Sequence, residues 1–132
     1  MTIELQALVW ACVTLIVLLG VQGALVPINQ GFAWGLGSRD EPRDMTAFQG
    51  RMRRIVANHI EGLVVFAGLV LAAHLAGISS STTQIGAILF VLARVLFAVT
   101  YMAGVPVVRS VIWGVGTFGI LMIAVDVIAA SI

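Results

Sequence analysis

Residues 51 to 61 place charged and polar side chains on one face of a helix that runs into an apolar stretch. Arg51, Arg54, Asn58 and Glu61 follow one another at steps of three, four and three, so on a helix their side chains share one face. Residues 62–73, which come next, are apolar enough to lie in a lipid bilayer. An ionisable side chain at membrane depth is costly unless it is paired or reaches water, so this face is a candidate binding site.

A second charged residue, Arg94, lies within the apolar stretch of residues 84–105. It is about eleven residues from the C-terminal end of that stretch, or about 16 Å along a helix, which is close to mid-bilayer. On the antiparallel helix before it, Glu61 would lie about 10 Å deep, with Asn58 level with Tyr101. The reach of an arginine then allows a Glu61–Arg94 ion pair, within one subunit or across an interface.

The charges in this part of the chain do not balance. Arg54, Arg94 and Arg109 accompany a single glutamate, and Arg51 and Arg53 lie close by at the membrane edge. One interpretation is that such a cluster fixes the register of packed helices and has no other role. However, an excess of cationic charge at depth is costly, so we expect an anionic ligand or a water-filled cleft beside it.

The composition is that of an integral membrane protein, with 61% hydrophobic and 10% charged residues. Four apolar stretches are long enough to span about 30 Å of hydrocarbon: residues 5–27, 55–77, 84–105 and 110–130. No segment alternates with period two as barrel strands do, so we predict an all-α bundle of four transmembrane helices, with residues 1–132 as one domain. The first stretch begins with Glu4 instead of a basic cluster, and we interpret it as a retained helix, not a signal peptide.

The arginines are distributed asymmetrically between the connecting segments. The loop of residues 78–83 carries no charge, whereas five arginines lie between the first span and the apolar part of the second: Arg39, Arg43, Arg51, Arg53 and Arg54. The positive-inside rule therefore predicts that residues 28–54 and the turn at 105–109 face the cytoplasm and that both termini face away from it. The acidic residues interleaved with these arginines argue against a nucleic-acid partner.

Several kinds of site are not supported by the sequence. Cys12 is the only cysteine, so we expect no disulfide framework, no thiolate metal cluster and no protein nucleophile. His59 and His74 are fifteen residues apart and are best interpreted as packing or interface residues, so no metal site is predicted. The glycines of residues 114–119 match a dinucleotide-binding pattern, but no strand precedes them, and we interpret them as helix-packing glycines.

Together these polar residues resemble the pattern of the MAPEG family, the membrane-associated proteins of eicosanoid and glutathione metabolism. The resemblance covers residues 50–115 and rests on three groups, one on each of the last three helices: Arg54, Asn58 and Glu61; Ala93, Arg94 and Tyr101; and Arg109 with Ser110. The resemblance is to bacterial-type members of the family, and it implies a homotrimer in the bacterial inner membrane. Its glutathione sites would lie between adjacent subunits and open toward the cytoplasm.

The resemblance also implies roles for individual residues. The predicted glutathione-binding residues are Arg51, Arg54, Asn58, Glu61, Arg94 and Tyr101. Arginines with Asn58 would hold the two carboxylates of glutathione, and Glu61 would take its ammonium group. Arg109 is the first candidate for stabilising the thiolate and Ser110 the second; lowering the thiol pKa by about two units requires roughly 2.7 kcal/mol.

The chain also departs from the family pattern. Phe97 stands where related eicosanoid synthases carry Tyr or His, Gly62 stands where some members carry a tyrosine, and the interval from Tyr101 to Arg109 differs by a residue from some members. These departures weaken the prediction of any particular reaction more than they weaken the prediction of glutathione binding. The resemblance therefore predicts a detoxifying glutathione transferase or peroxidase that acts on a hydrophobic small molecule from the lipid bilayer.

Two other function classes stay open. A small multidrug-type transporter would also have four short spans, but it needs a membrane-embedded acidic residue. Only Cys12 and Thr14 lie in the middle of the first span, and Asp126 is expected to be solvated near the outer end of the last. A non-catalytic helper subunit could keep the polar cluster for assembly alone. Three interpretations stay open for the segment from Asn29 to Gly50: a lid, an interfacial amphipathic piece or a plain linker.

Overall fold

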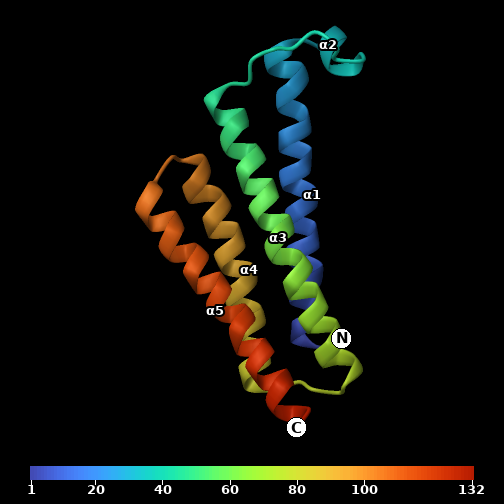
Figure 1. Cartoon of the computed structure of the whole chain (residues 1–132), viewed down its shortest axis with the longest axis vertical. Helices are drawn as coiled ribbons and strands as arrows, with labels where there is room; N and C mark the ends of the chain where they lie inside the picture. The colour runs from blue at the N-terminus through green and yellow to red at the C-terminus, as the bar shows by residue number, and fades with distance from the viewer.

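The computed structural model describes all 132 residues and is entirely helical outside its connecting segments (Figure 1). Its helices are α1 (Ile3–Gln30), α2 (Phe32–Leu36), α3 (Ala47–Leu75), α4 (Ser81–Met102) and α5 (Pro106–Ala130). All but the short α2 are long and apolar enough to cross a membrane, which confirms the predicted all-α fold with four spans. Helix α3 begins at Ala47, earlier than the predicted span at residue 55, so the arginines of residues 51–54 are helical.

The connections divide between the two ends of the bundle. Figure 1 shows both chain ends at the same end as the α3–α4 loop, whereas α2 and the α4–α5 turn lie at the opposite end. Helix α1 packs against α3 and α4, and α5 packs against α4 and α3. The arginine-rich segment and the α4–α5 turn therefore lie at the same end. A chain that crosses the membrane four times requires this, because its first and third connections fall on the same side.

The starts of three helices are defined by local sequence. Thr46 and Gln49 form a capping box at the start of α3, and Ser80 and Thr83 form one at the start of α4. Pro106 opens α5, where its missing N–H is not needed. Gly104 in the preceding turn has φ +76°, a conformation that glycine adopts without strain. Gly104 and Pro106 together set the point at which α4 reverses into α5.

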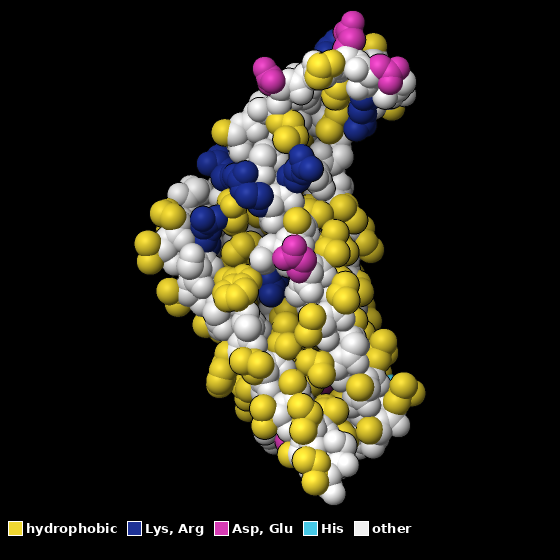
Figure 2. Space-filling view, in the orientation of Figure 1, with side chains coloured by type: hydrophobic (Ala, Val, Ile, Leu, Met, Phe, Trp, Pro, Cys, Tyr) yellow, Lys and Arg dark blue, Asp and Glu magenta, His cyan; other side chains and the backbone are white.

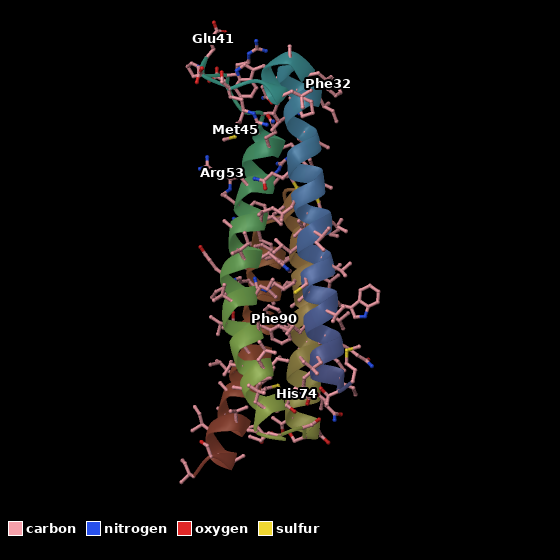
Figure 3. The ribbon with its side chains drawn as sticks, turned by 90° about the vertical axis from the view of Figure 1, so that its right-hand side faces the viewer. Phe32, Glu41, Met45, Arg53, His74 and Phe90 are labelled. Carbon is pink, nitrogen blue, oxygen red and sulfur yellow. The ribbon has the colours of Figure 1, made fainter.

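Two apolar clusters form the core. The larger contains Phe66 and Phe90, whose rings stack with centroids 4.1 Å apart between α3 and α4; Phe90 is seen inside the bundle in Figure 3. The smaller contains Met52 and Ile55 and lies nearer the arginine-rich end. His59 is buried with its Nε2 2.9 Å from the Ala11 carbonyl oxygen, so it is a packing histidine, as predicted.

Glycines allow α4 and α5 to approach closely. A Cβ added to Gly119 would lie 2.5 Å from the Gly86 carbonyl oxygen, and one added to Gly86 would lie 2.6 Å from the Gly119 carbonyl oxygen. A Cβ on Gly116 would lie 3.1 Å from the Ala93 Cβ, whereas one on Gly114 would meet nothing within 4 Å. The interpretation as packing glycines is confirmed for Gly116 and Gly119.

The segment after α1 is ordered by its own contacts. The guanidinium groups of Arg39 and Arg43 lie 5.7 and 5.6 Å from the Trp34 ring centroid, and Trp34 Nε1 donates to the Glu41 carbonyl. The side-chain amides of Gln30 and Gln49 donate to each other at 2.9 and 2.8 Å, which ties the end of α1 to the start of α3. This segment is therefore a compact cap beyond the end of α1 (Figure 1).

Two carboxylates are hydrogen-bonded around the start of α4. Glu4 is buried and accepts from the hydroxyls of Thr83 and Ser79, and Asp126 accepts from the Ser80 hydroxyl. The expectation that Asp126 is solvated was wrong, because the close approach of α4 and α5 brings its half-buried carboxylate to the α4 capping residue. Both carboxylates lie near the chain-terminal ends of α1 and α5, and their hydrogen bonds link these ends to the start of α4.

Candidate functional site

A pocket of about 360 Å³ lies where the starts of α3 and α5 meet the end of α4. We call it the arginine pocket. Figure 2 shows basic side chains gathered on this face above a surface that is mainly hydrophobic. No acidic residue is among those that line it: Ala47, Gly50, Arg51, Arg54, Tyr101, Gly104, Pro106 and Arg109. The pocket is therefore strongly cationic.

Tyr101 holds two of these arginines in place. Arg54 Nε donates a hydrogen bond of 2.7 Å to the Tyr101 hydroxyl. The Arg109 guanidinium lies over the face of the same ring, 4.0 Å from its centroid. The ring in turn packs edge-on against Phe97, with centroids 5.5 Å apart. A cation over an aromatic face is favourable, so Tyr101 fixes the spacing of Arg54 and Arg109 without neutralising either.

The remaining arginine has unused hydrogen-bonding capacity. The Arg51 guanidinium lies 5.8 Å from the Phe48 ring centroid, and its Nε is buried without a hydrogen-bond partner. Leaving a buried donor unpaired costs about 1–3 kcal/mol. The Arg109 Nε donates only to the Pro106 carbonyl, at 3.3 Å. Three guanidinium groups thus share one pocket without a carboxylate, an arrangement that favours an anionic ligand.

The α4–α5 turn brings the third arginine to the other two. Arg51 and Arg54 are one turn apart on α3, and the reversal at Gly104 and Pro106 returns the chain so that Arg109, in the first turn of α5, reaches them. A Cβ on Gly104 would lie 3.4 Å from Arg51 Nη1. Sequence reasoning missed Gly104 and Pro106 as pocket residues, although a glycine and a proline between two spans are a recognisable turn signal.

Arg94 is buried between α3, α4 and α5. Its Nη1 donates a 2.5 Å hydrogen bond to Asn58 Oδ1, and its guanidinium lies 4.9 Å from the Phe90 ring centroid. A Cβ on Gly62 would lie 2.6 Å from Arg94 Nη2, so the guanidinium occupies the space that a side chain at position 62 would fill. Gly62, a departure from some family members, is the residue that makes room for this arginine.

Within this subunit Arg94 does not form the ion pair with Glu61 that helix depth allows; a pair across a subunit interface stays a prediction. Arg94 bonds to Asn58, and its Nε is buried without a hydrogen bond, whereas the Glu61 side chain is exposed. Helix depth places Glu61 and Arg94 near each other, but the rotation of α3 decides which side chain turns inward. Asn58 and Gly62 face α4 here, and Glu61 points outward.

The arginine pocket contains four of the predicted site residues: Arg51, Arg54, Tyr101 and Arg109. Asn58 and Arg94 lie deeper in the bundle and do not line it. Glu61 is outside the pocket on the exposed surface of α3. Ser110 is also outside, exposed, with its hydroxyl donating to the Pro106 carbonyl at 3.2 Å. No group of three or more potential metal ligands is present.

Comparison with known proteins identifies the family of the chain. The family model described as MAPEG family matches residues 7–129, which is almost the whole chain. Neither a search of curated proteins nor one of solved structures finds a significant match. Members of the matched family use glutathione. A multi-pass helical chain with a cationic pocket formed by its last three long helices, matched over nearly its full length, belongs to the MAPEG family.

Proposed function

We propose that this protein is a membrane-bound glutathione transferase or peroxidase that acts on hydrophobic electrophiles from the lipid bilayer. The observation that carries the proposal is the arginine pocket, in which three guanidinium groups converge and no carboxylate is present. Family membership supports glutathione as the co-substrate, since the family includes glutathione transferases and peroxidases besides non-catalytic members.

The pocket suits the anionic groups of glutathione. At about 360 Å³ it falls within the range of roughly 300–1,000 Å³ that is typical of small-molecule sites. Planar guanidinium groups bind carboxylates through paired hydrogen bonds, so Arg51 and Arg54 can hold the two carboxylates of the tripeptide. The unpaired Arg51 Nε supplies a donor for one of them.

The ammonium group of glutathione needs an acceptor, which we assign to Glu61. In one protomer its exposed side chain lies outside the arginine pocket. The proposal therefore includes a homotrimer, as the family resemblance implies, in which neighbouring subunits complete each site. Asn58 and Arg94 support the site from the interior, because their hydrogen bond fixes the inward face of α3 beneath it.

The chemistry is attack by the glutathione thiolate. A guanidinium beside the sulfur favours the ionised thiol, and we assign this role to Arg109, with the Ser110 hydroxyl as the alternative. In a transferase, the sulfur bonds to an electrophilic carbon. Either a leaving group departs from that carbon with the bonding electron pair, or the electrons of a multiple bond or ring bond move to a neighbouring atom, which then takes up a proton. In a peroxidase, two glutathione molecules reduce a hydroperoxide to an alcohol and water and become the disulfide.

We further propose that the pocket opens toward the cytoplasm, where reduced glutathione is available. The arginines around it support this orientation through the positive-inside rule, and the chain termini would then face away from the cytoplasm.

Turnover assays separate the enzyme from a non-catalytic helper. Protein purified in detergent is mixed with glutathione and either a chlorinated dinitrobenzene or an organic hydroperoxide. Conjugate or oxidised glutathione should form faster than without protein, and Arg109→Ala should reduce the rate. Tight glutathione binding with neither product above background would contradict the enzymatic proposal and favour the helper subunit.

A further inference from the structure

The length of α4 implies that the arginine pocket lies at the level of the lipid headgroups. Helix α4 has 22 residues, which span about 33 Å at 1.5 Å per residue, close to the roughly 30 Å of bilayer hydrocarbon. Its two ends therefore mark the two borders of the hydrocarbon layer. The α4–α5 turn and the pocket beside it extend beyond the border into the polar layer, where phospholipid phosphates lie.

The same end of the molecule also presents an aliphatic surface. On the first turns of α5, Val107, Val108 and Val111 are 73%, 48% and 63% exposed. They belong to the helix that carries Arg109 into the pocket but point away from it. A cationic pocket beside an aliphatic strip fits a molecule with an anionic head and long hydrocarbon chains. A water-soluble tripeptide makes no use of the strip.

We propose that the arginine pocket binds the headgroup phosphate of an anionic phospholipid from the adjoining leaflet. Phosphate oxygens accept from guanidinium groups as carboxylates do, and a net negative lipid is favoured over a zwitterionic one by the uncompensated charge. The acyl chains would lie along Val107, Val108 and Val111. A consequence, which rests on the proposed function, is that this lipid and glutathione exclude each other, so membrane composition regulates access of glutathione to its site.

Native mass spectrometry of the full-length protein in a neutral detergent tests lipid binding without a charged membrane surface. Equal amounts of phosphatidylglycerol and phosphatidylcholine are added. The wild-type protein should retain phosphatidylglycerol preferentially. Arg54→Gln and Arg109→Gln should each lose this preference, and using two variants guards against misfolding of one. Arg53→Gln removes the same charge from an exposed residue outside the pocket and should behave as wild type.

Equal retention of the two lipids by the wild type, or equal loss in Arg53→Gln and the pocket variants, would overturn the proposal, because either result indicates diffuse surface charge. In the second arm of the experiment, inorganic phosphate is added to the protein with phosphatidylglycerol bound. If it displaces phosphatidylglycerol at matched concentration, the pocket is a site for free phosphate and the lipid proposal is wrong.

Added glutathione should also displace the lipid. By mass action, glutathione at about four times its Kd should lower lipid affinity about fivefold. Retention of the lipid under these conditions would overturn the competition. Calorimetry of glutathione binding in lipid-free detergent decides the proposed function separately, because that measurement contains no competing phospholipid.

Discussion

At the scale of single residues, the site depends on aromatic rings that hold arginines without neutralising them. Tyr101 accepts a hydrogen bond from Arg54 and supports Arg109 on its face, and Phe48 lies beside Arg51. A carboxylate in their place would have cancelled the charge that a ligand needs. Arg51 and Arg54 could be predicted from their spacing on one helix face, and Tyr101 and Arg109 from the resemblance to the MAPEG pattern. The contacts by which the Tyr101 and Phe48 rings hold these arginines could not be predicted.

The two contacts of Tyr101 can be separated by substitution. Tyr101→Phe removes the acceptor for Arg54 but keeps the ring beneath Arg109, whereas Tyr101→Leu removes both. Since a hydrogen bond to a charged group contributes about 1.5–3 kcal/mol, we expect Tyr101→Phe to weaken glutathione binding by at least about tenfold. Tyr101→Leu should weaken it further. Equal Kd values for the two variants in calorimetric titrations would mean that the ring has no role in positioning Arg109.

The thiolate assignment is tested by ultraviolet absorbance. If Arg109 stabilises the thiolate, glutathione bound to the wild type near neutral pH should show thiolate absorbance that glutathione alone lacks. Arg109→Ala should reduce this absorbance more than it weakens binding, because the cation acts mainly on the charged sulfur. Ser110→Ala serves as the comparison for the alternative donor. Undiminished absorbance in both variants would remove both residues from this role.

At the scale of helices, the spans follow from hydropathy, but their contacts do not. Runs of apolar residues predicted all four long helices, and capping residues account for where α3 and α4 begin. The contact of Gly86 with Gly119 and the pairing of Arg94 with Asn58 depend on helix rotation and crossing. Neither contact is encoded in the order of residues along a single helix, so the sequence could not show that Arg94 bonds to Asn58 and not to Glu61 within the subunit.

The α4–α5 crossing predicts a difference between two glycines on the same helix. An alanine at Gly119 would bring its Cβ to 2.5 Å from a backbone carbonyl, whereas an alanine at Gly114 would meet nothing within 4 Å. Overpacking of a helix contact typically costs about 1–3 kcal/mol. We expect a cost in this range because the backbone carbonyl cannot move aside as a flexible side chain can. Gly119→Ala should therefore lower the Tm in detergent, and Gly114→Ala should leave it unchanged or raise it. Matching Tm values would argue against this close crossing.

At the scale of the whole molecule, the arginines line a pocket and predict an orientation in the membrane. The pocket lies beside the α4–α5 turn, and this turn is at the end opposite the two termini (Figure 1). If the positive-inside rule holds, that end is cytoplasmic and meets the cellular pool of glutathione. The excess charge that orients the chain would then also bind its ligand.

Reporter fusions at Ile132 test this orientation. We expect a C-terminal alkaline phosphatase to be active and a C-terminal fluorescent protein that folds only in the cytoplasm to be dark, because the arginine-poor end should face away from the cytoplasm. The opposite pattern would place the arginine pocket outside the cytoplasm.

The most direct test of the arginine pocket as a glutathione site is calorimetric titration of detergent-purified wild type, Arg54→Ala and Arg53→Ala with glutathione. Arg54 lines the pocket, while its neighbour Arg53 projects away from the bundle (Figure 3). We expect saturable binding to the wild type, a Kd raised at least about tenfold in Arg54→Ala, and a change within about twofold in Arg53→Ala, as for an exposed charge. Equal Kd values for the two variants, or no binding to the folded wild-type protein, would contradict the assignment of the pocket to glutathione.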